Sequence, residues 1–121
     1  TGNSVDFGDM TSNTTYSCAA ANSVRGLSAG DATNNDAAID AVTISTTGNA
    51  VDFGDMATNI HARQGCSSPL RMAIMGGGAP SYTSKCEFVT INTFGNGVDF
   101  GNASAAWGYS HDFSNSHGGL A

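Results

Sequence analysis

The sequence predicts an all-β fold, and three observations support that prediction. Residues that favour helices are scarce, with one Glu, one Lys, one Gln and three Leu among 121 residues. Stretches such as Ala38–Ile44 alternate between small or polar and β-branched residues, which is the period of a half-buried strand. Gly, Asn and Asp cluster between these stretches and favour turns, because they accept positive φ angles at low cost. We therefore expect short strands joined by turns, with no helical periodicity.

A repeat of 46 to 47 residues organises the chain. The motif Thr-Gly-Asn-x-Val-Asp-Phe-Gly-Asp-Met begins at Thr1 and again at Thr47, and a close variant begins at Phe94. Other landmarks keep the period, since Val-Thr-Ile occurs at 42–44 and at 89–91. The sequence therefore predicts one continuous repeat array, with repeats at 1–46 and 47–93 and a partial repeat at 94–121.

One period contains about four short strands. We place them near residues 24–29, 38–44, 50–55 and 62–67, with turns at Gly30-Asp31 and at 46–49. Four strands in about 40–50 residues is the size of one β-propeller blade. The expected architecture is therefore an array of antiparallel four-stranded blades.

The order of landmarks resembles the kelch repeat over nearly the whole chain. Gly76-Gly77-Gly78 stands in the place of the family's diglycine, and Glu87–Ile91 in the place of its second strand. Val98-Asp99-Phe100 takes the place of the tryptophan-bearing strand, although Phe replaces Trp and Gly30 has no glycine beside it. The resemblance implies kelch-like propeller blades.

The Thr-Gly-Asn-x-x-Asp-Phe-Gly-Asp motif, with its spacing, also resembles repeat proteins of aquatic bacteriophages and environmental sequences. That resemblance implies virion or phage-tail material with a structural or adhesive role and no known catalytic residues. The chain spans about 2.6 repeats, whereas propellers close with about 4–8 blades. Three interpretations remain open: a window of a longer repeat chain, a subunit that completes its blades with neighbouring strands in a ring or filament, and a self-sufficient monomer.

Composition and charge narrow the classes of function. The chain has 4 Lys and Arg against 10 Asp and Glu, for a net charge of -6, so it lacks the basic surface that nucleic acid attracts. No stretch approaches the ~18 apolar residues of a membrane span. Gly, Ser, Thr and Asn make up 53 of the 121 residues. This weakly charged, hydroxyl-rich composition favours an extracellular or virion location, and we expect no cofactor.

Two sets of residues recur with the repeat. The apolar set alternates on one face of a predicted strand and is expected to form the core between blades: Val5, Phe7, Val51, Phe53, Val98 and Phe100. The acidic set could bind Ca²⁺ through oxygen ligands, although capping of turns by backbone hydrogen bonds is the preferred interpretation: Asp6, Asp9, Asp52, Asp55 and Asp99.

Other candidate sites are less distinctive. Ser110, His111 and Asp112 do not make a hydrolase site, because no Gly-x-Ser-x-Gly motif accompanies them. The three thiols are interpreted as small buried side chains, with a Cys66–Cys86 bridge left open, and lack zinc-site spacing: Cys18, Cys66 and Cys86. Two sequons are glycosylation candidates, at Asn13 and Asn102.

An aromatic cluster distinguishes the third repeat from the first two. Trp107, Tyr109 and Phe113 could stack on a sugar or a partner, or could equally seal the last blade. We therefore expect a non-enzymatic structural protein that assembles with itself into a ring, appendage or filament and presents adhesive loops. The alternative is a lectin-like propeller module that binds a cell-surface glycan.

Overall fold

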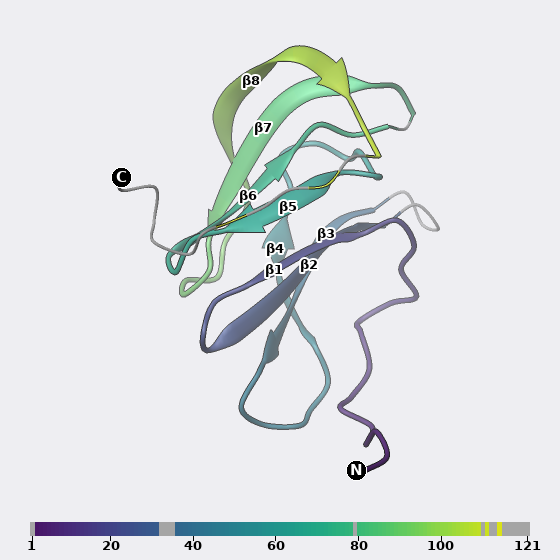
Figure 1. Cartoon of the computed structure of the whole chain (residues 1–121), viewed down its shortest axis with the longest axis vertical. Helices are drawn as coiled ribbons and strands as arrows, with labels where there is room; N and C mark the ends of the chain where they lie inside the picture. Colours follow the sequence, from purple (N-terminus) through teal and green to yellow (C-terminus); the bar gives the residue numbers. More distant parts are fainter. Residues whose placement is uncertain (1, 32–35, 79, 110, 112–113, 115–121) are drawn as a thin grey trace.

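The computed structural model describes residues 2–31, 36–78, 80–109, 111 and 114 (Figure 1). It contains eight antiparallel strands in two four-stranded sheets, which confirms the predicted all-β class. The first sheet follows chain order and consists of β1 (Cys18–Ala21), β2 (Arg25–Asp31), β3 (Asp36–Thr43) and β4 (Val51–Asp55). The second has the same order and consists of β5 (Gln64–Ser67), β6 (Arg71–Met75), β7 (Thr83–Thr90) and β8 (Val98–Trp107).

Local sequence explains the turns between the first two strands of each sheet. Asn22 Oδ1 accepts hydrogen bonds from the backbone N–H groups of Val24 and Arg25, at 2.9 and 2.8 Å. Ser68 Oγ accepts the equivalent pair from Leu70 and Arg71. Such side-chain acceptors replace the backbone bonds that a turn leaves unmade, so each hairpin folds from its own residues.

The two sheets share one register of strand pairing. Cys18 pairs with Ala29 as Gln64 pairs with Met75, an offset of 46 residues. Between the third and fourth strands, partners in the first sheet recur 47 residues later in the second, and both ladders shift register at the same place. The sheets are therefore two copies of one supersecondary unit.

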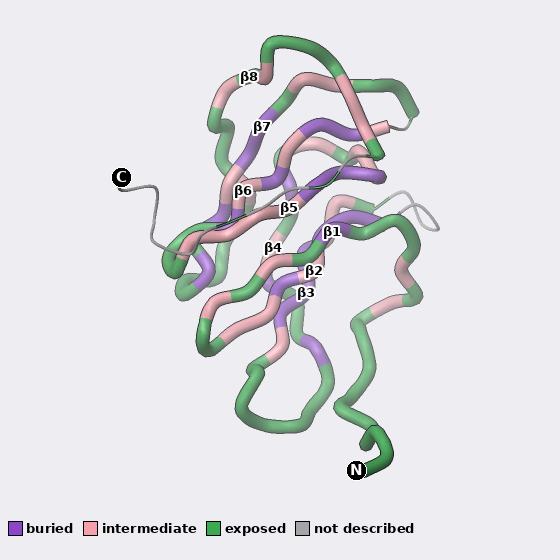
Figure 2. Tube along the Cα trace, viewed as in Figure 1, coloured by how far each residue is buried: buried purple, intermediate pink, exposed green. Residues whose placement is uncertain are grey.

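The sheets stack against each other, with β1 beside β5 (Figure 1). Figure 2 shows buried residues concentrated in the strands where the two sheets meet. A single apolar cluster joins Leu27, Ile39 and Phe53 of the first sheet to Met72 and Val89 of the second. Since one four-stranded sheet cannot bury either of its faces alone, this contact supplies the core.

The predicted core residues are buried less often than expected. Only Phe53 is buried, at 2% exposure, and five of the six are exposed: Val5, Phe7, Val51, Val98 and Phe100. Val51 and Val98 begin β4 and β8, the last strands in their sheets. Alternation identified the face of each strand, but the neighbouring sheet determines whether that face is covered.

Candidate assembly surfaces

The contact between the two sheets uses a different face from each. Five buried residues of the first sheet point toward the second: Leu27, Ala29, Ile39, Ala41 and Phe53. Four buried residues of the second sheet meet them: Met72, Ile74, Glu87 and Val89. We call this contact the sheet interface. Each sheet also has a second face that points away from the other sheet, and the two outer faces are compared with this interface below.

The open face of the first sheet is the counterpart of the face that the second sheet buries. It consists of the residues that lie 46 or 47 positions before Met72, Ile74, Glu87 and Val89, namely Gly26, Ser28, Asp40 and Val42. A hollow of about 400 Å³ with mostly apolar walls lies over these residues and the strand β1, with Met10 at its edge. Met56, the equivalent of Met10, is buried inside the sheet interface at 4% exposure.

The open face of the second sheet is the counterpart of the face that the first sheet buries. Its residues match the five listed for the first sheet, and all but the buried Cys86 are half-buried or exposed: Ala73, Met75, Cys86, Phe88 and Phe100. Phe88 and Phe100 make an edge-to-face contact with ring centroids 5.9 Å apart. Phe100 is nevertheless 64% exposed. In the described residues, each end of the stack thus carries one half of the sheet interface, except beside β5, where Tyr109 N–H donates to the Ala62 carbonyl and the Ser114 hydroxyl donates to the Ser67 carbonyl.

Two equivalent arginines make different contacts, depending on whether a second sheet is stacked beside them. Arg25 of the first sheet lies over the ring of Phe94 at 4.6 Å and donates a hydrogen bond of 2.6 Å to the carbonyl of Ile91, so it reaches into the second repeat. Arg71 is its equivalent in the second sheet and lies over Phe88, in its own sheet, at 4.5 Å. Arg25 therefore bridges the sheet interface, and Arg71 occupies the corresponding position on an open face.

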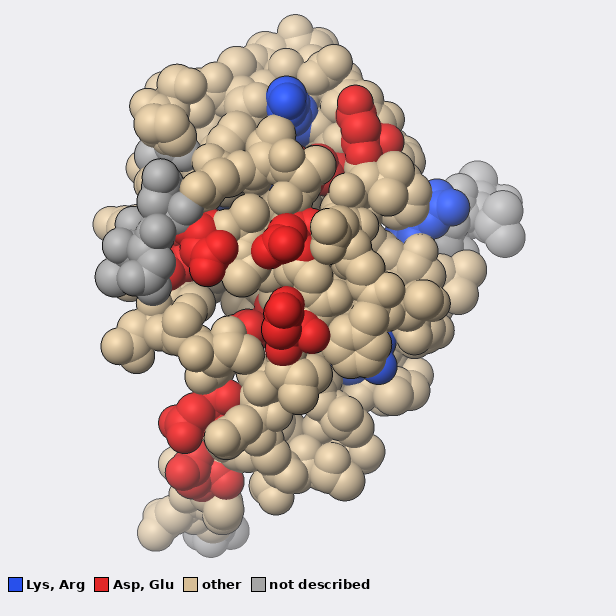
Figure 3. Space-filling view, turned by 180° about the vertical axis from the view of Figure 1, so that it is seen from behind, with Lys and Arg blue, Asp and Glu red and all other residues tan. Residues whose placement is uncertain are grey.

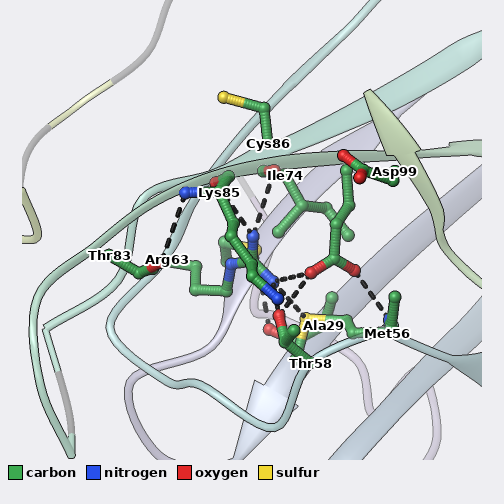
Figure 4. A network of polar contacts seen from close by, with 12 residues as sticks. Ala29, Met56, Thr58, Arg63, Ile74, Thr83, Lys85, Cys86 and Asp99 are labelled. Atoms are coloured by element: carbon green, nitrogen blue, oxygen red, sulfur yellow. Dashed lines mark hydrogen bonds and ion pairs between the residues drawn. The ribbon is translucent and has the colours of Figure 1, made fainter. Parts of the chain in front are cut away.

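A buried ion pair holds the centre of the sheet interface (Figure 4). Arg63 Nη1 lies 2.6 Å from Glu87 Oε1, and their side chains are 1% and 2% exposed. The second oxygen of Glu87 accepts from the Ala57 N–H at 2.7 Å, and Thr58 donates its hydroxyl to the first. Arg63 Nη2 donates to the carbonyls of Ile74 and Lys85. This degree of hydrogen bonding makes a buried charge pair tolerable.

The first sheet carries a reduced version of this network. Asp40 aligns with Glu87 and is 4% exposed. Thr11, which aligns with Ala57, donates to Asp40 through its hydroxyl at 2.6 Å and its backbone N–H at 3.2 Å. Ser17 stands where the second repeat has Arg63. Neither the repeat nor strand alternation predicted this network, although the single Glu of the chain, Glu87, stands between Cys86 and Phe88 and could have indicated a buried charge.

The repeated acidic residues bind their own backbone. Asp6, Asp52 and Asp99 each accept a hydrogen bond from the glycine two positions later, at 3.1, 3.0 and 2.8 Å. These bonds have the geometry of turn capping. Within the described residues, no group of three or more His, Cys, Asp or Glu is arranged to hold a metal ion.

The remaining predicted residues are scattered. Cys18 and Cys86 are buried and Cys66 is half-buried; Cys86 is a free thiol, so the Cys66–Cys86 bridge is not formed. The sequon residues Asn13 and Asn102 are exposed. Ser110, Asp112 and Phe113 lie outside the described residues.

The aromatic cluster divides into two roles. Trp107 lies against Gly76, where an added Cβ would be 2.8 Å from the indole ring, and its carbonyl accepts from the Gly77 N–H at 2.8 Å. Tyr109 instead meets Tyr16 edge to face, with centroids 6.3 Å apart. These two tyrosines border a hollow of about 240 Å³ whose wall includes Gln64 and His111. Gln64 is 5% exposed and its Oε1 has no hydrogen-bond partner in the described part of the chain.

The charge distribution and the comparisons with known proteins bear on the possible functions of the chain. Acidic side chains are spread down the face seen in Figure 3. No helix in the described residues is long and apolar enough to cross a membrane. No protein-family model matches the chain, and no curated protein matches its sequence. The kelch-like resemblance therefore stays a prediction.

Proposed function

We propose that this chain is a non-enzymatic structural repeat protein that assembles with itself by stacking its sheets head to tail. The observation that carries the proposal is the equivalence between the two open faces and the two halves of the sheet interface. A second copy that places its second sheet on the first sheet of this one repeats a contact that already exists inside the molecule, apart from the edge at β5, where Tyr109 and Ser114 of the incoming copy already bind. Such heterologous contacts give rings when the rotation closes and filaments when it does not.

The exposed apolar surface supports this proposal. Apolar surface that is contiguous and exposed is typical of interaction sites, and here it lies at both ends of the stack. The hollow over the first sheet is bordered by Met10 and Val42, and its equivalents Met56 and Val89 are buried in the sheet interface. An extracellular or virion location agrees with the low charge of the chain, and kelch-like blades around an axis are the architecture we propose for a closed assembly.

Sedimentation velocity over a range of concentrations tests this function. The wild-type chain should form particles whose masses are multiples of 12.2 kDa. Val42→Asp places a charge in the apolar hollow and should shift the distribution toward the monomer. Val24→Asp is the matched control, since Val24 is 55% exposed in the β1–β2 turn and outside the hollow. A wild-type chain that stays monomeric at every concentration would contradict the proposal.

A glycan-binding role is the second candidate, supported by the hollow between Tyr16 and Tyr109. Aromatic rings offer faces for a sugar, and the unpaired Oε1 of Gln64 is an acceptor for a hydroxyl group. A glycan array with wild-type protein and Tyr109→Ala tests this role. Binding that the substitution removes would favour it, and the absence of binding to any glycan would exclude it.

A further inference from the structure

We infer that the loop at residues 47–50, together with the hollow of the first sheet, is the docking site for the β8 edge of a second copy of this chain. Residues 5–9 occupy the loop part of that site in the single copy. This inference rests on the proposed function and specifies which strand of the partner docks and in which register.

The docking geometry is visible inside the molecule, where β4 meets the loop of the following repeat. Gly95 N–H donates to the Phe53 carbonyl at 3.0 Å, and Gly97 N–H donates to the Asp55 carbonyl at 2.7 Å. The Asn96 side chain accepts from the Asp55 N–H at 3.1 Å. A fourth strand thus uses its outer edge to bind the next repeat's Gly-Asn loop.

Residues 5–9 make the same three bonds to the equivalent loop. Gly48 N–H donates to the Phe7 carbonyl at 2.7 Å, and Ala50 N–H to the Asp9 carbonyl at 2.8 Å. The Asn49 side chain accepts from the Asp9 N–H at 3.1 Å. Figure 1 shows this N-terminal segment running beside the loop that joins β3 to β4. The segment therefore docks as a fourth strand does.

In the described residues, this segment has no sheet behind it. In the part of the chain that the structure describes, no strand pairs with residues 5–9, and Val5 is 84% exposed. The strand β8 is the converse case, because its first half, from Val98 to Asn102, pairs with β7 while Val98 and Phe100 are exposed. It has the sheet, and no described loop binds the backbone of Phe100 and Asn102 as residues 94–97 bind β4.

The two strands are interchangeable at the loop. Both read Val-Asp-Phe-Gly, followed by Asp9 in the segment and Asn102 in β8. When a second copy stacks as the two internal sheets do, its β8 reaches the position that residues 5–9 occupy. The exchange replaces three hydrogen bonds with three of the same kind, and the stacked faces add apolar burial that the segment alone does not provide. A second copy is therefore the occupant that matches the site.

Glycines in the two strands allow a matched test. A Cβ on Gly8 would lie 2.4 Å from the Gly48 carbonyl oxygen, and a Cβ on Gly54 would lie 2.7 Å from that of Gly95. A Cβ on Gly101 meets nothing within 4 Å in the single copy. By equivalence, the Gly101 methyl would collide with the loop only after β8 has docked on a partner. Gly8→Ala should thus weaken the segment, and Gly101→Ala should block the incoming strand.

The experiment measures the dissociation constant for self-association by sedimentation equilibrium in the full chain. We expect Gly101→Ala to weaken association by at least about tenfold, or 1.4 kcal/mol, and Gly8→Ala to strengthen it severalfold. Gly2→Ala is the control, because no atom lies within 4 Å of its added Cβ. Monomer folding is checked in parallel by circular dichroism at low concentration.

The outcomes separate this inference from the function on which it rests. Association that is sensitive to Val42→Asp but unchanged by Gly101→Ala would overturn the β8 register and leave stacking intact. Weaker association of Gly8→Ala would also overturn it, because residues 5–9 would then be contributing to the contact instead of occupying its place. Absence of any association in the wild-type chain would remove the proposed function as well.

Discussion

Phe53 and Phe100 occupy equivalent positions in two strands that begin with the same four residues, yet their environments differ. Each follows a Val-Asp pair and precedes a glycine that donates to that Asp. Phe53 is 2% exposed and Phe100 is 64% exposed. The difference arises from the next repeat, because Phe94 packs on Phe53 with centroids 5.2 Å apart and Arg25 lies over both rings. In the described residues, no following repeat covers Phe100 in this way.

This comparison separates what a repeat contributes alone from what stacking contributes. Turns, strand register and the Asp-to-glycine bonds are present in both sheets. Burial of the aromatic ring and the bridging contacts of Arg25 are present only where one repeat meets the next. The local unit therefore specifies the sheet, and the neighbour supplies most of the core, as in other repeat arrays.

The largest effect is expected from truncating the two phenylalanines. Phe53→Ala should lower the free energy of unfolding by about 3–5 kcal/mol, the cost of removing a buried aromatic ring. Phe100→Ala should cost under about 1 kcal/mol, because little of its surface is buried. Urea denaturation of the monomer measures both. Equal losses for the two variants would refute the comparison.

The buried polar sites provide the next test. Arg63→Met leaves the Glu87 carboxylate in the sheet interface without its cation and should destabilise the protein by about 3 kcal/mol. That value is at the low end for such pairs because Thr58 and the Ala57 N–H still donate to Glu87. Asp40→Asn, in the sheet without the arginine, should cost about 1 kcal/mol. Thermal unfolding at one pH measures both, and a larger loss for Asp40→Asn would reverse our ranking of the two sites.

Glycine substitutions sharpen the comparison at the backbone. Gly54 has φ +142° and faces the Gly95 backbone, so Gly54→Ala adds a steric clash to backbone strain and should cost about 2–3 kcal/mol. Gly101 has φ +122° with open space around it, so Gly101→Ala should cost only the strain, about 1 kcal/mol. Denaturation midpoints compare the variants in dilute solution. A larger loss of stability for Gly101→Ala than for Gly54→Ala would contradict this comparison, because it would mean that Gly101 has a close neighbour in the single copy.

The smallest effect concerns contacts that both sheets share. Asp52→Ala and Asp99→Ala each remove one exposed hydrogen bond to a glycine N–H, and each should cost about 0.5 kcal/mol. The two values should agree, because these bonds do not depend on stacking. Paired thermal melts measure the difference. A clearly larger loss for Asp52→Ala would mean that the neighbouring repeat contributes to this bond too.

The sequence predicted the local unit well, because its signals are local. The strands expected near 24–29, 38–44, 50–55 and 62–67 overlap β2, β3, β4 and β5, although the last of them begins the second sheet and the turn expected at Gly30-Asp31 lies inside β2. The exposure of Phe7 and Phe100 could not be predicted, because alternation shows which side of a strand a residue is on and does not show whether another sheet covers that side. The Arg63–Glu87 pair joins residues 24 positions apart across a turn and a hairpin, and neither the repeat nor alternation indicated that contact.

The most direct test of head-to-tail stacking is a complementation experiment with two variants that each lose one open face. Val42→Asp blocks the first sheet, and Ala73→Asp places a charge on the half-buried centre of the second sheet's open face. Native mass spectrometry should find each variant alone at 12.2 kDa. An equimolar mixture should form a particle of twice that mass that contains one chain of each kind, since the two intact faces can still meet. A mixture that stays monomeric, in a protein whose wild type assembles, would contradict the account.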